Sequence, residues 1–193
     1  MVKDIFPGNL ASQPYLTAVG STLYFQASNG TNGYELWKSD GSADGTVMVK
    51  DINAGAADSS PSYLAVIGST LYFQAGDAAT GFELWRSDGS AESTVMVKDI
   101  NLGATSSTPS YLAAAGSTLY FQATDGLVGS ELWKSDGSAS GTVMVKDINL
   151  GASSSSPSYL AAIGSSIYFQ AGDGLVGSEL WKSDGSTEST VMV

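Results

Sequence analysis

The stretch Trp37-Lys38-Ser39-Asp40-Gly41-Ser42 decides the fold of this chain, because it returns at a fixed interval. A tryptophan opens nearly the same phrase at each further step of 48 residues along the 193-residue chain. The four tryptophans are Trp37, Trp85, Trp133 and Trp181. Self-similarity at a fixed period of about 20 to 50 residues is typical of solenoid and propeller proteins. The repeat is therefore the unit from which the fold must be read.

Each repeat contains four short extended segments separated by turns, as the third copy shows most clearly. Its first segment ends at a Gly-Ser turn, the second is rich in aromatic residues, and the fourth is rich in β-branched residues. Asp136-Gly137 begins a hairpin connection between the third and fourth segments. The expected strands of this repeat cover residues 111–115, 118–123, 130–135 and 142–148. Four short antiparallel strands in 48 residues are typical of one propeller blade.

The side-chain pattern of the second segment indicates a sheet that is covered on both faces. Leu119, Phe121 and Ala123 point to one side, whereas Tyr120 and Gln122 point to the other, and neither side carries a charge. The Gly, Pro and Ser clusters leave no stretch long enough to form a helix with apolar residues at 3.6-residue spacing. A β-helix is the main rival, but its coils are shorter and pair in parallel. The sequence predicts an all-β chain in which residues 1–193 form a single β-propeller ring or half-ring of four blades.

The two ends of the sequence fall within the same expected strand of the repeat. Val191-Met192-Val193 matches the start of the fourth strand, and Met1-Val2-Lys3-Asp4-Ile5 matches its remainder. A propeller must close, because an open arc exposes apolar blade faces and sheet edges. Either the chain closes on itself as four blades, or two copies form an eight-bladed ring. The side chains of the inner strand are small, and the Val and Met side chains of the outer strand are of moderate size. This side-chain bulk favours the larger ring, so we expect a homodimer.

Composition excludes several classes of function. The net charge of −11 disfavours DNA, RNA and anionic membranes as partners. The chain contains no cysteine and no histidine, which removes disulfides, thiolate nucleophiles, histidine bases and the usual zinc sites. No apolar run approaches the ~18 residues of a membrane span. Met1-Val2-Lys3-Asp4-Ile5 lacks the apolar core of a signal peptide, so we expect none in this sequence.

The repeated motif is expected to be structural. Each turn aspartate should accept backbone N–H bonds, and each tryptophan should pack between blades. The turn aspartates are Asp40, Asp88, Asp136 and Asp184. One carboxylate per turn is too few for a calcium site, so we expect no metal and no cofactor.

A second set of charges recurs in the blades and suggests cross-strand ion pairs. Their carboxylates are Glu35, Glu83, Glu131 and Glu179, and their cations are Lys3, Lys50, Lys98 and Lys146. Glycoside hydrolysis needs two carboxylates that converge in one cleft. Identical acids that recur in every blade do not make such a site, because an active site breaks the symmetry of the repeats. We therefore expect no enzymatic activity.

The connections between strands offer the only candidate ligand site. In a propeller, the loop between the fourth and first strands emerges on the same face as the loop between the second and third. The candidate residues on these loops are Asn101, Ser106, Asp77, Asn149, Ser154, Asp125 and Asp173. Their hydroxyl, amide and carboxylate groups would suit a sugar, repeated for multivalent capture. The alternative interpretation is that serine-rich loops merely solvate the surface.

The phrase Glu-Leu-Trp-x-x-Asp-Gly-Ser, present in all four repeats, resembles the motif of the bacterial ELWxxDGT-repeat proteins. In that family the eighth position is commonly threonine, where this chain has serine. The resemblance spans essentially the whole chain and implies exported, extracellular repeat proteins with no established common activity. The strand order is similar to that of quinoprotein-like and kelch propellers, but their quinone-binding residues have no counterpart here.

The third and fourth repeats are nearly identical, which indicates recent amplification or a deliberately engineered or excised propeller fragment. We expect a non-enzymatic, self-assembling propeller scaffold. The alternative is a multivalent carbohydrate-binding lectin that uses the loops between blades.

Overall fold

The computed structural model describes residues 2–5 and 15–193, and it contains four antiparallel sheets of four strands each. Residues 1 and 6–14, which the predicted domain includes, lie outside the described residues. Blade 1 contains β1 (Thr17–Val19), β2 (Thr22–Ala27), β3 (Glu35–Ser39) and β4 (Val47–Lys50). Blade 2 contains β5 (Ser62–Ile67), β6 (Thr70–Asp77), β7 (Gly81–Ser87) and β8 (Val95–Lys98). Blade 3 contains β9 (Ser110–Ala115), β10 (Thr118–Ala123), β11 (Glu131–Ser135) and β12 (Val143–Lys146). Blade 4 contains β13 (Ser158–Ile163), β14 (Ser166–Gly172), β15 (Ser178–Ser183) and β16 (Val191–Met192).

The strands within each blade follow one another in sequence order, as a simple antiparallel meander. In blade 3 the expected second strand is β10, with both ends as predicted. The fourth strand ends two residues earlier than predicted, at Lys146. Its continuation leaves the sheet because the N–H of Ile148 donates to the Glu131 side chain and not to the backbone of β11.

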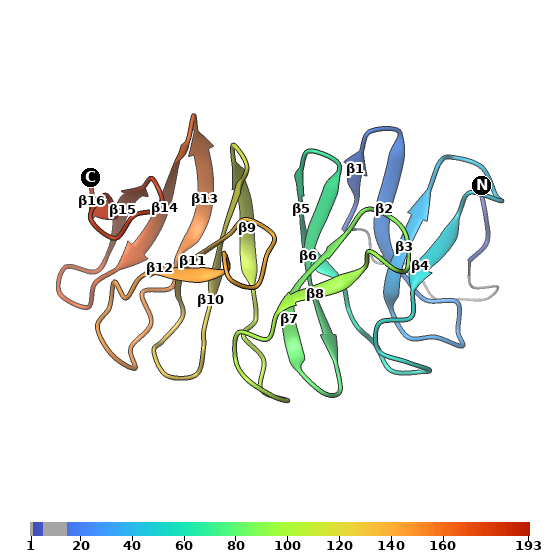
Figure 1. Ribbon diagram of the computed structural model, residues 1–193, viewed down its shortest axis with the longest axis horizontal. Helices are drawn as coiled ribbons and strands as arrows, with labels where there is room; N and C mark the ends of the chain where they lie inside the picture. Colours follow the sequence, from blue (N-terminus) through green and yellow to red (C-terminus); the bar gives the residue numbers. More distant parts are fainter. Residues whose placement is uncertain (1, 6–14) are drawn as a thin grey trace.

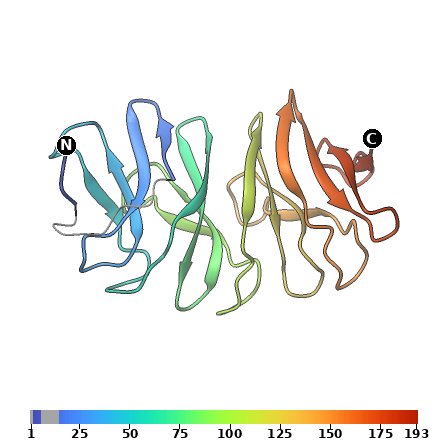
Figure 2. The ribbon, with the colours of Figure 1, turned by 180° about the vertical axis from the view of Figure 1, so that it is seen from behind.

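The four blades stand side by side in an arc (Figures 1 and 2), and the ends of the chain lie at opposite ends of that arc. Strand β9 lies between β5 and β13, so the first strands of the blades gather along the inner side. The expected alternative of four blades closed by the chain itself is not what the structure shows. Blades 1 and 4 each keep one face turned outward.

The core lies between neighbouring blades, and each interface joins two different faces. The face that a blade turns to the next blade, here called the tyrosine face, consists in blade 3 of Tyr120, Leu132, Val145 and Ile148. The face that a blade turns to the preceding one, here called the phenylalanine face, consists in blade 4 of Ile167, Phe169, Ala171 and Trp181. Equivalent residues form the interfaces between blades 1 and 2 and between blades 2 and 3. The predicted alternation in the second strand is thus confirmed, because odd and even positions supply opposite faces.

The Asp-Gly turns of blades 2, 3 and 4 each lie against a tyrosine of the preceding blade. Gly137 adopts a φ of +89°, and a Cβ atom added to it would lie 2.3 Å from the Tyr72 hydroxyl. Glycine is therefore required both for the backbone conformation and for the approach of Tyr72. In blade 4 the turn residue Gly185 lies against Tyr120 in the same way. Its carbonyl accepts a hydrogen bond from the Lys134 ammonium at 2.7 Å, and this bond links blades 3 and 4.

Candidate functional site

The glutamate that precedes each Leu-Trp pair forms a buried hydrogen-bond node. In blade 3 the Glu131 carboxylate is completely buried. It accepts bonds from the N–H of Ile148 at 2.9 Å, the N–H of Ser155 at 2.8 Å and the hydroxyl of Ser155 at 2.5 Å. In blades 1 and 2, Glu35 and Glu83 accept the three equivalent bonds from the isoleucine and serine at the same repeat positions. Each node fixes the end of a fourth strand to the connection that leads into the next blade.

The predicted ion pairs between these glutamates and the strand lysines are wrong. The partners of Glu131 are the backbone and serine donors of its own node, as described above. The ammonium of Lys146 instead crosses to blade 4, where it donates to the Thr190 carbonyl at 2.8 Å and lies 5.9 Å from the centre of the Trp181 ring. Lys50 and Lys98 make the same carbonyl bond to the blade that follows them. The lysines therefore join blades, whereas the glutamates organise connections.

Burial raises the pKa of the Glu35, Glu83 and Glu131 carboxyls, and the hydrogen bonds from serine hydroxyls and backbone N–H groups oppose this rise. A raised folded-state pKa contributes stability that is fully present below the ordinary glutamate pKa of about 4.3 and is lost as the pH rises through the raised value. We expect the urea midpoint to fall across this window, and to fall less in the Glu83→Gln variant. Equal pH slopes for the variant and the parent chain would contradict this expectation.

The turn aspartates act in the opposite direction. The Asp136 carboxylate accepts bonds from the hydroxyl and the N–H of Ser138, at 2.7 and 2.8 Å. The bond from the Ser138 hydroxyl has the larger effect and the bond from the Ser138 N–H the smaller, and both hold the pKa of Asp136 below its ordinary value. Serine hydroxyls in the other three turns lower the pKa values of their aspartates likewise. This contribution is present above the ordinary aspartate pKa and is lost as the pH falls through the lowered value.

The predicted ligand residues gather as the topology requires, but the bonds they make lie within the chain. The Nδ2 group of Asn101 donates to the Ser106 carbonyl at 3.1 Å, and the Ser106 hydroxyl accepts from the N–H of Phe82 at 2.9 Å. Asn149 and Ser154 repeat this arrangement one blade later. The three loop aspartates each accept backbone N–H bonds from residues two and three positions ahead: Asp77, Asp125 and Asp173. These groups therefore shape the loops.

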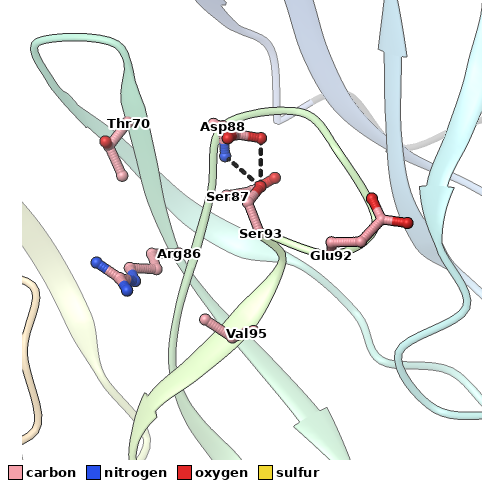
Figure 3. A pocket seen from close by; sticks show the side chains of 7 residues that line it. All are labelled: Thr70, Arg86, Ser87, Asp88, Glu92, Ser93 and Val95. Carbon is pink, nitrogen blue, oxygen red and sulfur yellow. Dashed lines mark hydrogen bonds between the residues drawn. The ribbon is translucent and has the colours of Figure 1, made fainter.

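A shallow hollow recurs beside the Asp-Gly turn of blades 1, 2 and 3. In blade 2 its volume is about 320 Å³ (Figure 3), and its lining comprises Thr70, Arg86, Ser87, Asp88, Glu92, Ser93 and Val95. The Ser93 hydroxyl accepts from the N–H of Asp88 at 3.0 Å and donates to the Asp88 carboxylate. Arg86 extends away from this pair, so the two charges do not converge.

The tyrosine at the second position of the first strand in blades 2, 3 and 4 was not predicted to have a role. Tyr63, Tyr111 and Tyr159 form a row along the inner side of the arc, with ring centres 6.0 and 6.2 Å apart. Each has a φ of 53 to 55°, an uncommon conformation for a residue other than glycine. Each also lies where the pairing with the second strand shifts register. The signal was available, because a tyrosine recurs at this position in every repeat.

The outward faces of the two terminal blades expose residues that the internal interfaces bury. Leu23, on the phenylalanine face of blade 1, is 37% exposed, whereas its equivalents in blades 2, 3 and 4 are completely buried. Leu180, on the tyrosine face of blade 4, is 51% exposed, whereas its equivalents in blades 1, 2 and 3 are completely buried. Glu179 is exposed as well, unlike the three buried node glutamates. On the phenylalanine face of blade 1 the departure concerns Leu23, whereas Phe25, Ala27 and Trp37 of the same face stay buried.

Within residues 2–5 and 15–193, no three acidic side chains gather in a way that could hold a metal ion. The described part of the chain also has no helix that is long and apolar enough to cross a membrane.

No protein-family model and no curated protein matches the chain. Among solved structures, it is similar to the computationally designed Ika8 protein, with a TM-score of 0.51 and 17% identity over 92% of this chain and 48% of that chain. It is also similar to prolyl oligopeptidase B from Galerina marginata, with a TM-score of 0.49 and 15% identity over 90% of this chain and 24% of that one. For puromycin hydrolase the TM-score is 0.46, with 16% identity over 95% of this chain and 32% of that one.

The chain thus spans about half the length of Ika8 and smaller parts of the two enzymes. At such identities a likeness shows the fold alone. Together with the four four-stranded antiparallel sheets, it establishes that the chain is all-β and built from β-propeller blades.

Proposed function

We propose that this chain is a structural scaffold without catalytic activity, and that it forms half of a propeller ring closed by a second copy. Blade 4 of each copy docks on blade 1 of the other, which gives eight blades and two identical junctions related by a twofold axis. The observation that carries this proposal is the exposure of Leu23 and Leu180 at positions that every internal interface buries. Apolar side chains exposed at positions that are otherwise buried mark candidate interaction sites.

The turn of blade 1 provides a second complementary feature. In blades 2, 3 and 4 the turn glycine lies under a tyrosine of the preceding blade. A Cβ atom added to Gly41 would meet nothing within 4 Å, although its φ of +91° matches the others. Tyr168 of blade 4 is the equivalent tyrosine, and the neighbouring Lys182 is equivalent to the lysine that donates to Gly185. Docking of a second copy would bring Tyr168 and Lys182 onto the Gly41 turn.

Light scattering after size-exclusion chromatography tests the proposal directly. We expect a mass of about 40 kDa, twice the 19.8 kDa of one chain, in buffer of about 0.15 M salt that screens the charge of −11 per copy. A mass of 19.8 kDa at micromolar concentration would overturn the proposal. A ladder of larger masses would also overturn it, because head-to-tail contacts that do not close produce open filaments.

The proposal also includes membership of the ELWxxDGT-repeat proteins and export from the cell. Both are supported by the presence of the Glu-Leu-Trp-x-x-Asp-Gly-Ser motif in every blade. Carbohydrate binding by the loops between blades stays a prediction of the sequence. The bonds that the predicted residues make within the chain do not favour it.

A further inference from the structure

We infer that the second copy's segment Val2–Ile5 completes blade 4 at each junction, with Lys3 opposite Leu180 and the N–H of Ile5 donating to Glu179. This inference rests on the proposed ring closure. It adds to the proposed closure the backbone segment Val2–Ile5, which would extend the sheet of blade 4, and the Glu179 carboxylate, which the junction would bury.

Residues Val2–Ile5 already occupy the position of the end of a fourth strand that precedes blade 1. The ammonium of Lys3 donates to the Thr46 carbonyl at 2.8 Å. Lys50, Lys98 and Lys146 make the equivalent bond from the fourth strands of blades 1, 2 and 3, at 2.7 to 2.8 Å.

Apolar packing gives the same placement. Ile5 packs against the phenylalanine face of blade 1, formed by Phe25, Ala27 and Trp37. Ile52, two residues beyond the end of β4, packs in the same way against Phe73, Ala75 and Trp85 of blade 2. The segment is therefore held on blade 1 of its own copy, in a position to reach a further blade on its other side.

The fourth strand of blade 4 is shorter than those of the other three blades. Strands β4, β8 and β12 contain four residues each, whereas β16 contains two. In the complete blades the last residue of the strand is a lysine that lies opposite the leucine of the third strand, as Lys146 lies opposite Leu132. Leu180 is the equivalent leucine, and its carbonyl already accepts the N–H of Val193 at 2.9 Å.

The repeat sets the register of the join. Val193 corresponds to Val145, and the residue that follows Val145 in the repeat is a lysine, Lys146. In the second copy that residue is Lys3, followed by Asp4 and Ile5. Val2 also corresponds to Val145 and is 53% exposed, so Val193 and the second copy's Val2 would compete for one position. The bond from Val193 to Leu180 assigns that position to Val193.

Glu179 explains why the segment is needed for closure. Docking would bury its carboxylate, as Glu131 is buried in blade 3. A buried carboxylate without hydrogen-bond donors opposes association, whereas one with several donors is tolerated. In each complete node one donor is the N–H of the isoleucine that follows Lys-Asp, and Ile5 of the second copy is that isoleucine. The segment thus extends the sheet and supplies a partner for the carboxylate that the sheet buries.

Paired cysteines test the register, because the chain contains no cysteine of its own. Directly opposed residues of antiparallel strands have Cα atoms about 4.5 to 5.5 Å apart, which suits a disulfide. We expect the Lys3→Cys/Leu180→Cys double variant to give, on oxidation, a linked dimer of about 40 kDa on a non-reducing gel. The matched Lys146→Cys/Leu132→Cys variant has the same geometry within one chain and should close at 19.8 kDa. The Lys3→Cys/Leu127→Cys variant, with its second cysteine in an exposed loop, should link no more than background.

The outcomes separate the inference from the proposed function. The inference alone is overturned if the parent chain is dimeric by light scattering and the control pair forms its disulfide, but the cysteines at Lys3 and Leu180 form none. A monomeric parent chain overturns the proposed function as well.

Substitution of the buried Leu132 could prevent the control variant from folding. In that case a tandem chain, in which two copies are joined in one polypeptide, provides a second test of the register. In one version Val193 is followed directly by Lys3 of the second unit, and in the other by Met1. The first should unfold at a higher urea concentration, because no surplus residues interrupt the joined strand. Equal midpoints would overturn the assigned register.

Discussion

Replacement of Leu180 with aspartate should convert the dimer into a monomer with intact blades. Leu180 is half-exposed in the single chain, so the substitution does not disturb an internal core. In the closed ring the new carboxylate would be buried without a partner, which costs about 3 kcal/mol or more at each junction. The ring contains two junctions, so the total is about 6 kcal/mol, equivalent to a rise in Kd of about 10⁴-fold. Light scattering and the thermal midpoint of the resulting monomer check both parts of the expectation.

The Leu127→Asp variant is the matched control for this experiment. Leu127 lies in the loop between β10 and β11, is 83% exposed and gains the same negative charge. We expect it to stay dimeric, because its position lies away from the junction. A Leu180→Asp chain that keeps a mass of about 40 kDa at micromolar concentration would contradict the docking of blade 4 on blade 1.

Replacement of Glu131 with alanine should lower the free energy of unfolding by about 3 to 5 kcal/mol. The substitution removes the acceptor of the Ile148 N–H and of the Ser155 N–H, and it leaves the Ser155 hydroxyl only the Ser130 carbonyl at 3.5 Å. Each unsatisfied donor costs about 1 to 3 kcal/mol. The loss is large because this node fixes the connection between blades 3 and 4. Urea denaturation followed by tryptophan fluorescence measures it, with the slope of the transition as a check on cooperativity.

Glu179 provides an internal comparison, because it occupies the same repeat position but is exposed. Both substitutions should be made in the Leu180→Asp background, where the chain is expected to be monomeric. There the Glu179→Ala change should leave the urea midpoint unchanged, whereas Glu131→Ala should lower it. Equal losses at the two positions would show that the buried node is not the source of the stability.

The arrangement of strands could be predicted from the sequence because it depends on local patterns. The 48-residue spacing of the tryptophans set the number of blades, and the Asp-Gly turns set the hairpins. Alternation around Phe121 and Tyr120 separated the two faces of a blade, since successive residues of a strand point to opposite sides. Each of these features is determined by residues close together in the chain.

The candidate site was predicted less well, because the partners of polar groups depend on how distant segments return. The positions of Glu131 and Lys146 on adjacent strands suggested an ion pair. The connection to blade 4 instead places Ser155 over Glu131, and Lys146 reaches Thr190 of the next blade. Asn101 and Ser106 lie in the one loop between β8 and β9, and their bonds with the chain's own backbone could not be read from spacing.

By itself, the sequence determined that this protein is a row of four-stranded blades, because strand periodicity and turn chemistry are local properties. Only the tertiary structure decided which copies of the repeat are covered. Leu132 and Leu180 lie in the same sequence context, Ser-Glu-Leu-Trp-Lys-Ser, yet one is completely buried and the other is half-exposed. The physical reason is that burial depends on a neighbouring blade, and blade 4 has a neighbour on one side alone. Identical residues thus stabilise the interior at one position and form an open interface at the other.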